Sequence, residues 1–401
     1  MWLSRMKNQN ISANFKNLSA CRKTGMKVGI ITLPLQACCG RMLQAYALQS
    51  VLEDMGHDAV LLDRTCPDNR LYRLAAAAGR SGLKSLRKLS GMLMPGKRPS
   101  DWRIIPVEYA GSFISRYIRR LPVEDYMHLP DTGYDALIAG AGPVWNPDLF
   151  TGEAGAPENA FLRFAGMWRI RRIAYAASFG TDRWGYSGRV TKNCAALAGR
   201  FDVVSVSTMT DVGLCDRYLD VKASLVLDPM LLLEEDRYMQ LAGISGMNED
   251  CGRMTVFVSS LSSWKKSFID RLAAMKDMTP FNLGDVMCGR GPLPDDCQPC
   301  DFRDSPVEGW LKCIAGSGMV VTDSVYACFA SIIFRRQFIA LSDGSSASGS
   351  IGQLLSLLGL ENRIVHASGE YAGLPDIDYD EVYSNIGMMR RRSLDFLKSV
   401  L

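Results

Sequence analysis

Three side chains suited to binding or proton transfer lie close together in Thr322-Asp323-Ser324-Val325-Tyr326. They directly follow Met319-Val320-Val321, a short β-branched apolar run typical of a buried parallel strand. In open α/β sheets, ligands bind outside the carboxyl ends of strands, next to helix N-termini. We therefore expect Asp323, Ser324 and Tyr326 to face a ligand. A structural alternative is that Asp323 and Ser324 only cap the helix that follows.

Other turns could contribute to the same site. Residues 36–41 form a loop containing Gly40, and residues 140–146 form a Gly-rich turn ending in Trp145-Asn146. A single Gly-rich turn is a weak indication of phosphate binding. Trp145 and Asn146 fit a pocket wall, although Trp145 fits a hydrophobic core equally well. A further loop begins at Ser178, after another apolar run.

These turns lie between alternating strand and helix patterns. The alternation predicts an α/β fold of two Rossmann-like domains with a cleft between them. We expect a disordered extension or mis-assigned start at 1–25 and an N-terminal domain at 26–233 with a helical insertion at 64–126. A C-terminal domain is expected at 254–378, followed by a C-terminal helix at 379–401. The expected strands are 27–33, 58–62, 134–139, 172–177, 202–206, 223–227, 254–259, 279–283, 319–321, 337–341 and 363–366. The expected helices are 42–55, 71–93, 108–120, 189–198, 211–218, 264–275, 306–315, 327–334, 350–358 and 379–400, and 284–304 is expected to be a loop.

Composition limits the classes of function. The 401 residues are 47% hydrophobic and 22% charged, with a net charge of +4 spread along the chain. This small charge predicts neither nucleic-acid binding nor a polybasic membrane anchor. No apolar run approaches the roughly 20 residues that span a bilayer, and the first 25 residues lack the apolar core of a secretory signal. We expect a cytoplasmic protein, and a peripheral membrane contact or a homo-oligomer stays open.

The 12 cysteines are scattered and are expected to be reduced thiols. Cys297 and Cys300 form a single CxxC, which lacks the second ligand pair of a zinc site, so no metal site is predicted. The basic residues between 84 and 103 fit a solvated face or a contact with an anion or glycan phosphate.

Several stretches resemble, in order, the polysaccharide pyruvyl transferase family. They cover most of the chain from Met26 onward. The resemblance implies a glycosyltransferase-B-like fold and transfer of the enolpyruvyl group of phosphoenolpyruvate to sugar hydroxyls, which leaves a pyruvate ketal on a cell-surface glycan. It implies no cofactor, with phosphoenolpyruvate as donor and a glycan or lipid-linked sugar as acceptor. The stretches are KVGIITL, GRMLQAYALQSVLEDMGHDAVLLD, YDALIAGAGPVWNPDLF, RIAYAASFGT, FDVVSVS, LVLDPMLLL, VVTDSVYACFASIIFRRQFIAL and LLSLLGLENRIV.

The chain departs from the family pattern where the family carries its cations. Ser207-Thr208 replaces an Arg-Glu pair, Tyr326 replaces a histidine, and Gly349-Ser350 falls where a further arginine is expected. Residues 141–146 also differ from the family's Ser-Asp-Gln-Val-Trp-Asn. Phosphoenolpyruvate carries a phosphate and a carboxylate, and each charge-assisted hydrogen bond contributes about 1.5–3 kcal/mol. Arg335, Arg336 and the segment 84–103 are candidates to replace the lost charges.

Three hypotheses follow. The first is an active pyruvyltransferase with Tyr326, Asp323 and Ser324 as catalytic residues. The second is a member that has lost its chemistry and serves as a binding or scaffold partner in glycan synthesis, and the third is a transferase with another donor, such as a nucleotide sugar. In the first hypothesis, the donor or substrate is bound by Gly40, Trp145, Asn146, Ser178, Ser207 and Thr322.

Overall fold

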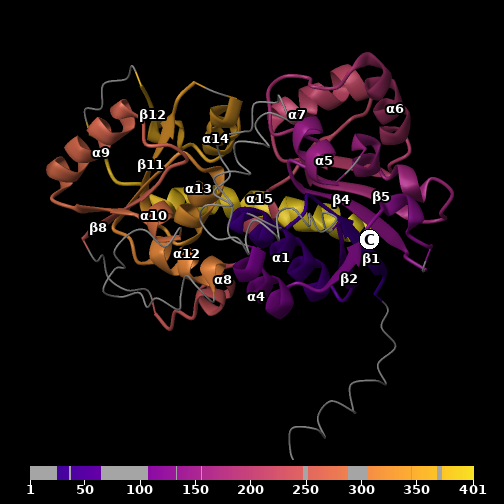
Figure 1. Cartoon of the computed structure of the whole chain (residues 1–401), viewed down its shortest axis with the longest axis horizontal. Coiled ribbons are helices and arrows are strands. Elements are labelled where there is room, and N and C mark those ends of the chain that lie inside the picture. Colours follow the sequence, from indigo (N-terminus) through magenta and orange to yellow (C-terminus); the bar gives the residue numbers. More distant parts are fainter. Residues whose placement is uncertain are drawn as a thin grey trace, which may run out of the picture.

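The computed structural model describes residues 25–35, 38–64, 107–131, 133–154, 156–246, 252–287, 305–344, 346–367 and 373–401. The first predicted helix of the insertion, the Cys297–Cys300 pair and the basic segment 84–103 lie outside these residues, as does almost all of the N-terminal extension. In the described part the chain forms two α/β units, each built on a parallel sheet (Figure 1).

The N-terminal unit carries seven parallel strands in the order β3-β2-β1-β4-β5-β6-β7. Its first six positions reproduce the 3-2-1-4-5-6 order of a Rossmann fold, because β1 is followed by a helical crossover to β2 and the chain then returns to the other side of β1. The strands are β1 Lys27–Ile31, β2 Asp58–Arg64, β3 Arg120–Val123, β4 Ala136–Gly142, β5 Arg171–Ala177, β6 Val203–Val206 and β7 Ser224–Leu225.

The C-terminal unit carries five parallel strands in the order β12-β11-β10-β8-β9. Counted from β8, this is the 2-1-3-4-5 order of flavodoxin-like sheets. The fold is therefore α/β with two Rossmann-like domains, a glycosyltransferase-B-like arrangement, as predicted. The strands are β8 Arg253–Phe257, β9 Thr279–Asn282, β10 Met319–Thr322, β11 Gln337–Ser342 and β12 Ile364–His366.

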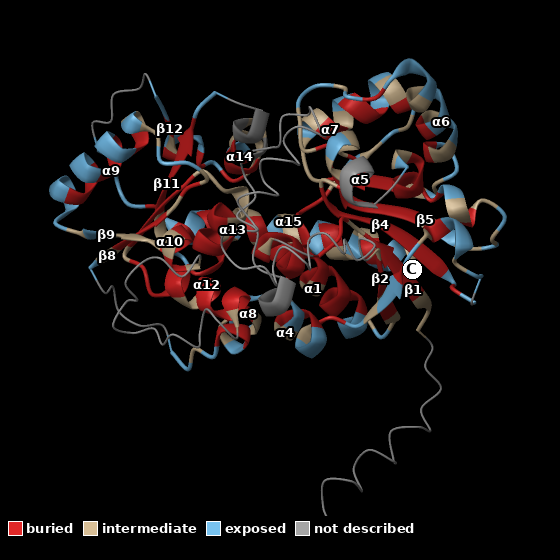
Figure 2. Cartoon of the chain, viewed as in Figure 1, coloured by how far each residue is buried: buried red, intermediate tan, exposed pale blue. Residues whose placement is uncertain are grey.

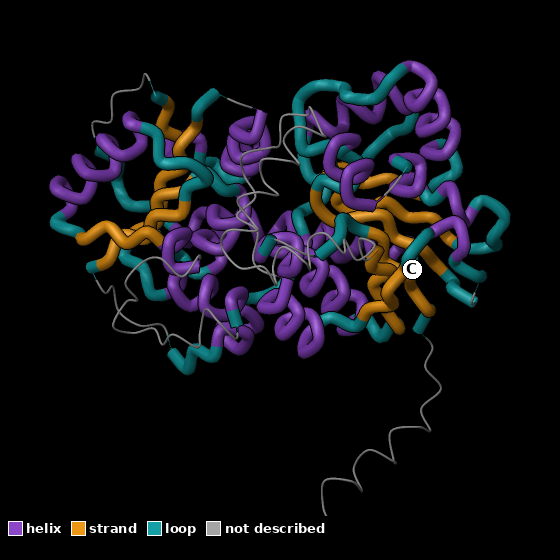
Figure 3. The backbone as a smooth tube through the Cα atoms, viewed as in Figure 1, coloured by secondary structure: helices purple, strands orange, loops and turns teal. Residues whose placement is uncertain are grey.

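Helices cover both sheets (Figure 3). The α-helices are α1 Cys39–Asp54, α4 Val107–Tyr117, α5 Pro147–Ala154, α6 Gly188–Ala198, α7 Met209–Leu214, α8 Glu235–Ala242, α9 Ser263–Lys276, α10 Leu283–Met287, α12 Pro306–Ala315, α13 Val325–Ile333, α14 Ser346–Leu357 and α15 Tyr379–Val400. One π turn spans Cys215–Leu219. Short 3-10 turns occupy Tyr126–His128, Pro157–Phe161, Arg163–Ala165, Pro229–Leu231 and Glu361–Arg363.

Four strands or helices were not predicted: the strand Arg120–Val123 and the helices Pro147–Ala154, Glu235–Ala242 and Leu283–Met287. The strand Arg120–Val123 pairs with β2 at the sheet edge, inside the stretch 64–126 that we expected to be a helical insertion. Its Pro122 is tolerated because an edge strand needs hydrogen bonds on one side only. The helix Leu283–Met287 occupies the beginning of the predicted loop 284–304.

One hydrophobic cluster joins the two domains. Strand residues alternate between sheet faces, and Val28 and Ile138 of the first sheet share this cluster with Val320 and Phe338 of the second. The opposite face of each sheet has a separate cluster. Burial is accordingly continuous across the centre of the molecule (Figure 2).

The last helix, α15, begins on one domain and ends on the other (Figure 1). Its Tyr383 hydroxyl donates to the Ile333 carbonyl of the C-terminal domain at 2.8 Å. Further along, Ser393 Oγ accepts from the Leu227 N–H of the N-terminal domain at 2.9 Å. This helix therefore contacts both domains, and its last part holds Leu227, which follows β7. Among the helices of the described residues, none combines the length and apolar character needed to cross a bilayer.

Candidate functional site

A cavity of about 490 Å³ lies between the two sheets. Its lining includes residues that follow β1, β4, β5, β6 and β7 on one side and β8 and β10 on the other. In both sheets the strand order reverses here, between β1 and β4 and between β8 and β10. Ligands of open α/β sheets bind at such reversal points, outside the carboxyl ends of the strands. The cavity is therefore the candidate site.

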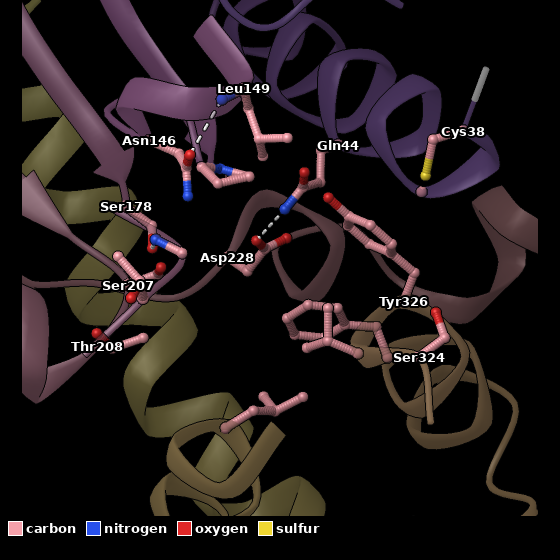
Figure 4. Close-up of a pocket in the computed structure, with 18 of the residues that line it drawn as sticks. Cys38, Gln44, Asn146, Leu149, Ser178, Ser207, Thr208, Asp228, Ser324 and Tyr326 are labelled. Atoms are coloured by element: carbon pink, nitrogen blue, oxygen red, sulfur yellow. Dashed lines mark hydrogen bonds between the residues drawn. The ribbon is translucent and has the colours of Figure 1, made fainter. Parts of the chain in front are cut away.

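The N-terminal wall holds four of the predicted residues: Gly40, Asn146, Ser178 and Ser207. Figure 4 shows Ser178 and Ser207 on one side of the pocket, opposite Tyr326. Asn146 has a structural task as well, because its Oδ1 accepts from the Leu149 N–H at 3.1 Å and its Nδ2 donates to the Phe179 carbonyl at 2.8 Å. It thereby caps α5 and ties two wall loops together.

A buried carboxyl holds the serine loops in place. Asp211 accepts from the Phe179 N–H at 3.0 Å and from Thr208 Oγ1 at 2.5 Å. Burial raises the pKa of this carboxyl, and the hydrogen bonds from Thr208 and Phe179 partly offset that effect. Thr208 lines the pocket whereas Asp211 lies behind it, so the loops after β5 and β6 share one anchor.

On the C-terminal wall, the Asp323 side chain is fixed by a hydrogen bond and an ion pair. Its carboxylate accepts from the Ser259 N–H at 2.7 Å and pairs with Lys265 Nζ at 2.7 Å. Lys265 is fully buried and also pairs with Asp343 at 2.6 Å. Burial alone would lower the pKa of Lys265, but the hydrogen bonds to Asp323 and Asp343 raise it. Asp323 thus contributes a neutralised carboxylate to the pocket wall.

The capping alternative is wrong for both residues it concerned. Ser324 occupies the N-cap position of α13, yet its side chain makes no capping hydrogen bond. Asp323 is engaged with Ser259 and Lys265 instead. Ser324 and the first-turn residues Val325 and Tyr326 line the cavity. The positive end of the α13 dipole therefore opens on the pocket.

Two predicted substrate contacts do not line the pocket. Trp145 is fully buried, stacks on Phe161 at 4.9 Å between ring centroids, and donates its indole N–H to the Ala160 carbonyl at 3.2 Å. Thr322 is also fully buried, and its hydroxyl donates to the Phe257 carbonyl at 2.6 Å. Both are core residues that support wall loops, and the stated alternative for Trp145 is the correct one.

A pair of polar residues at the centre of the pocket was not predicted from the sequence. Gln44 Nε2 donates to Asp228 Oδ2 at 2.5 Å, and both residues line the cavity (Figure 4). Burial raises the pKa of Asp228 to about 6, although hydrogen bonds from the Met230 N–H and from Gln44 oppose this. The Asp-Pro step after a strand was the available signal, but we interpreted it only as the end of that strand.

The charges of the lining are mainly negative. Among the lining residues in the described part of the chain, Arg183 is the single cation, whereas Asp148, Asp228 and Asp323 are carboxyls. Arg335 and Arg336, which we considered as replacements for the missing family arginines, are not among them. Within the described ranges, no group of His, Cys, Asp or Glu is arranged to hold a metal ion.

A sequence model of the polysaccharide pyruvyl transferase family matches residues 39–345. A search of curated protein sequences finds no match. Similar solved structures include E. coli ADP-heptose lipopolysaccharide heptosyltransferase II, with 12% identity, 92% of this chain and 99% of that chain covered, and a TM-score of 0.34. The UDP-GlcNAc 2-epimerase of Methanocaldococcus jannaschii has 10% identity, coverages of 91% and 93%, and a TM-score of 0.41. An Arabidopsis thaliana protein in complex with UDP-L-rhamnose has 12% identity, coverages of 94% and 94%, and a TM-score of 0.42.

Proposed function

The chain belongs to the polysaccharide pyruvyl transferase family, and from this premise we propose that it moves a pyruvyl group from phosphoenolpyruvate to a sugar of a cell-surface polysaccharide. The acceptor is a glycan or a lipid-linked sugar with two neighbouring hydroxyls, and the work is done in the cytoplasm. Both hydroxyl oxygens form bonds to C2 of the enolpyruvyl group, and phosphate leaves. One hydroxyl proton ends on C3 and the other leaves with phosphate or solvent, so the reaction balances without a cofactor.

The observation that carries this proposal is the open N-terminus of α13. Helix N-termini bind anions through their free N–H groups and their dipole. Ser324 stands at this end without capping it, and the first turn lines the pocket. A phosphate or carboxylate of the donor would bind there, and Arg183, an exposed residue of the N-terminal domain, also lines the pocket.

A second function is favoured by the charge of the lining. Three carboxyls and one arginine among the described lining residues are a poor match for a donor with two anionic groups. A transferase for another donor, such as a nucleotide sugar, would place fewer charges against Asp323 and Asp228. The loss of catalysis, with a binding or scaffold role retained, is the remaining alternative.

Calorimetry and thermal shift with phosphoenolpyruvate and a panel of nucleotide sugars test these functions. A ligand that binds the native state raises the melting temperature by linkage. Phosphoenolpyruvate should bind, and Arg183→Gln should weaken its binding about tenfold or more, the equivalent of one charge-assisted hydrogen bond. Arg189→Gln is the control, because Arg189 is exposed and does not line the pocket.

Each outcome selects one function. Binding of phosphoenolpyruvate with release of phosphate in the presence of a sugar acceptor supports the pyruvyltransferase. A response to a nucleotide sugar alone supports the second donor class. No response to any donor at millimolar concentration contradicts both transferases and supports a binding role.

A further inference from the structure

Asp228 is held at the centre of the pocket by a hydrogen bond from the backbone of the turn that follows it. It follows β7 and precedes Pro229, which begins the 3-10 turn Pro229–Leu231. Its Oδ1 accepts from the Met230 N–H at 3.0 Å, and Leu227 before it is bonded to Ser393 of α15. The position of this carboxyl is therefore fixed by the turn that follows it and by the last part of α15.

The second oxygen of Asp228 is fixed by Gln44. The amide of Gln44 lies against Gly142, where a Cβ would approach its Oε1 to 2.4 Å. This leaves Gln44 Nε2 directed at Asp228 Oδ2 (Figure 4). Each carboxylate oxygen has two acceptor positions, and one recorded donor on each leaves capacity for a substrate hydroxyl.

The surroundings of Asp228 favour a proton that can move. Among the residues that the structure describes, the titratable groups Tyr175 of β5 and Tyr238 of α8 interact with it, and their hydroxyls donate to the carbonyls of Leu227 and Met230. Burial raises the pKa of both tyrosines well above the usual range, so they stay neutral near pH 6. In the described part of the chain no cation forms an ion pair with Asp228, which is only 7% exposed.

We propose that Asp228 is the acid–base residue of this transferase, with Gln44 as the residue that positions it. The proposal rests on the proposed function. In the first step the Asp228 carboxylate takes the proton of one sugar hydroxyl as that oxygen bonds to C2, and passes this proton to C3, where the C2–C3 π electrons form the new C–H bond. In the second step it takes the proton of the other hydroxyl as that oxygen bonds to C2 and the C2–O bond to phosphate breaks, and this proton leaves with the phosphate, which returns Asp228 to the carboxylate form.

The other polar residues of the pocket are less suited to this task. Asp323 is already engaged in an ion pair with buried Lys265 at 2.7 Å. Tyrosine as a residue type ionises near pH ~10, which makes Tyr326 a poor acid–base group at neutral pH. Asp148 is exposed on the rim of the pocket and is not held at its centre. A general base works best when its pKa is near the operating pH, and burial raises the pKa of Asp228 to about 6.

The test is the pH dependence of kcat for Asp228→Asn at saturating donor and acceptor, with phosphate release as the readout. We expect kcat to fall by about 10²- to 10⁴-fold and the ionisation near pH 6 to disappear from the profile. Phosphate monoesters also ionise near pH ~6, so the comparison between variants decides. Asp148→Asn removes the same charge from the rim and should keep that ionisation.

Gln44→Leu gives a second measurement that does not change the carboxyl. The hydrogen bond from Gln44 lowers the pKa of Asp228, so its loss should move the ionisation in the kcat profile upward by about one pH unit. An unmoved ionisation in Gln44→Leu contradicts the proposal even if Asp228→Asn does not fold.

The donor and the acid–base residue are tested separately. If the wild type turns over phosphoenolpyruvate and the kcat of Asp228→Asn lies within threefold of the wild-type kcat, the role of Asp228 is overturned. The proposed function then stays intact. Turnover of a nucleotide sugar instead overturns the donor, and the same variants then decide the role of Asp228 with that donor. Absence of turnover with every donor of the panel overturns both.

Discussion

The ring of Tyr326 packs directly on Gly40: a Cβ at position 40 would lie 2.0 Å from Tyr326 Cγ. Gly40 belongs to α1 of the N-terminal domain and Tyr326 to α13 of the C-terminal domain. The contacted atom is the base of the ring, so rotation of the ring about its Cβ–Cγ bond cannot relieve a clash there. This pair therefore sets how closely the two domains approach at the pocket.

Gly40→Ala should destabilise the protein by about 1–3 kcal/mol, the usual cost of overpacking, because the methyl group must displace the Tyr326 ring or separate the domains. Thermal unfolding measures the change. Tyr326→Ala in the same chain should recover part of it, since the two changes meet at one contact. Gly111→Ala is the control, because a Cβ there meets no atom within 4 Å and should be neutral or stabilising by up to about 1 kcal/mol. Equal melting temperatures for Gly40→Ala and the wild type would contradict the contact.

The sequence predicted those elements whose signals are local. The helices 306–315 and 379–400 were placed at their observed ends, because Pro306 at the first helical position and Asp378 at the N-cap mark where they begin. The strand Arg120–Val123 was missed, because four residues with a proline carry little strand signal and only its pairing with β2 defines it.

The candidate site was predicted in part, for a similar reason. Polar residues directly after strands were identified, and Asp323, Ser324, Tyr326, Ser178 and Ser207 do line the pocket. Asp228 was missed because its significance depends on burial and on Gln44, 184 positions away, neither of which a local pattern reveals. Trp145 was misplaced because an aromatic residue beside a Gly-rich turn fits a wall and a core equally well.

Asp228→Asn should stabilise the folded protein at neutral pH. The folded-state pKa of about 6 exceeds the unfolded value near ~3.9, so the folded state is penalised by about 3 kcal/mol above pH 6, and this penalty disappears as the pH falls toward 4. The variant should therefore exceed the wild type by about 2 kcal/mol at pH 7.5, after one weakened hydrogen bond with Gln44. Urea unfolding at pH 4.5, 6 and 7.5 measures the difference, which should shrink at low pH.

Asp148→Asn serves as the control for this measurement, because its carboxyl is exposed and a surface change usually alters stability by less than about 0.5 kcal/mol. The opposite outcome is a wild type that is more stable than Asp228→Asn by the same amount at all three pH values. It would show that burial of the Asp228 carboxyl does not destabilise the folded state.

Lys265→Met should destabilise the protein by about 3 kcal/mol, because it leaves Asp323 without its buried cation. The raised pKa of Lys265 sets the pH range of this effect. Its contribution is complete below the unfolded value near ~10.4 and is lost as the pH rises through the folded value. Denaturant unfolding should thus show a constant difference from wild type between pH 7 and 9, and a smaller one only above about pH 10.4.

Lys266→Met tests whether the loss of any lysine on α9 has this effect. Lys266 is the exposed neighbour of Lys265, so its replacement should leave stability within about 0.5 kcal/mol of the wild type. Similar losses in the two variants would mean that the buried ion pairs with Asp323 and Asp343 contribute nothing specific.

Ser207→Arg should strengthen the binding of phosphoenolpyruvate. Ser207 lines the pocket where the family pattern has an arginine, and Arg183 is the one cation among the described lining residues. A new charge-assisted hydrogen bond of about 1.5–3 kcal/mol corresponds to an affinity gain of about 10- to 150-fold. Titration calorimetry measures the gain, which should decline with added salt because the pocket is open to solvent. Ser207→Gln adds length and hydrogen-bonding capacity without charge and should leave the affinity near that of the wild type. Equal affinities for Ser207→Arg, Ser207→Gln and the wild type would mean that position 207 does not face the donor. Adding Tyr326→His to Ser207→Arg should increase the affinity for phosphoenolpyruvate further below pH ~6.5, where the imidazole is charged.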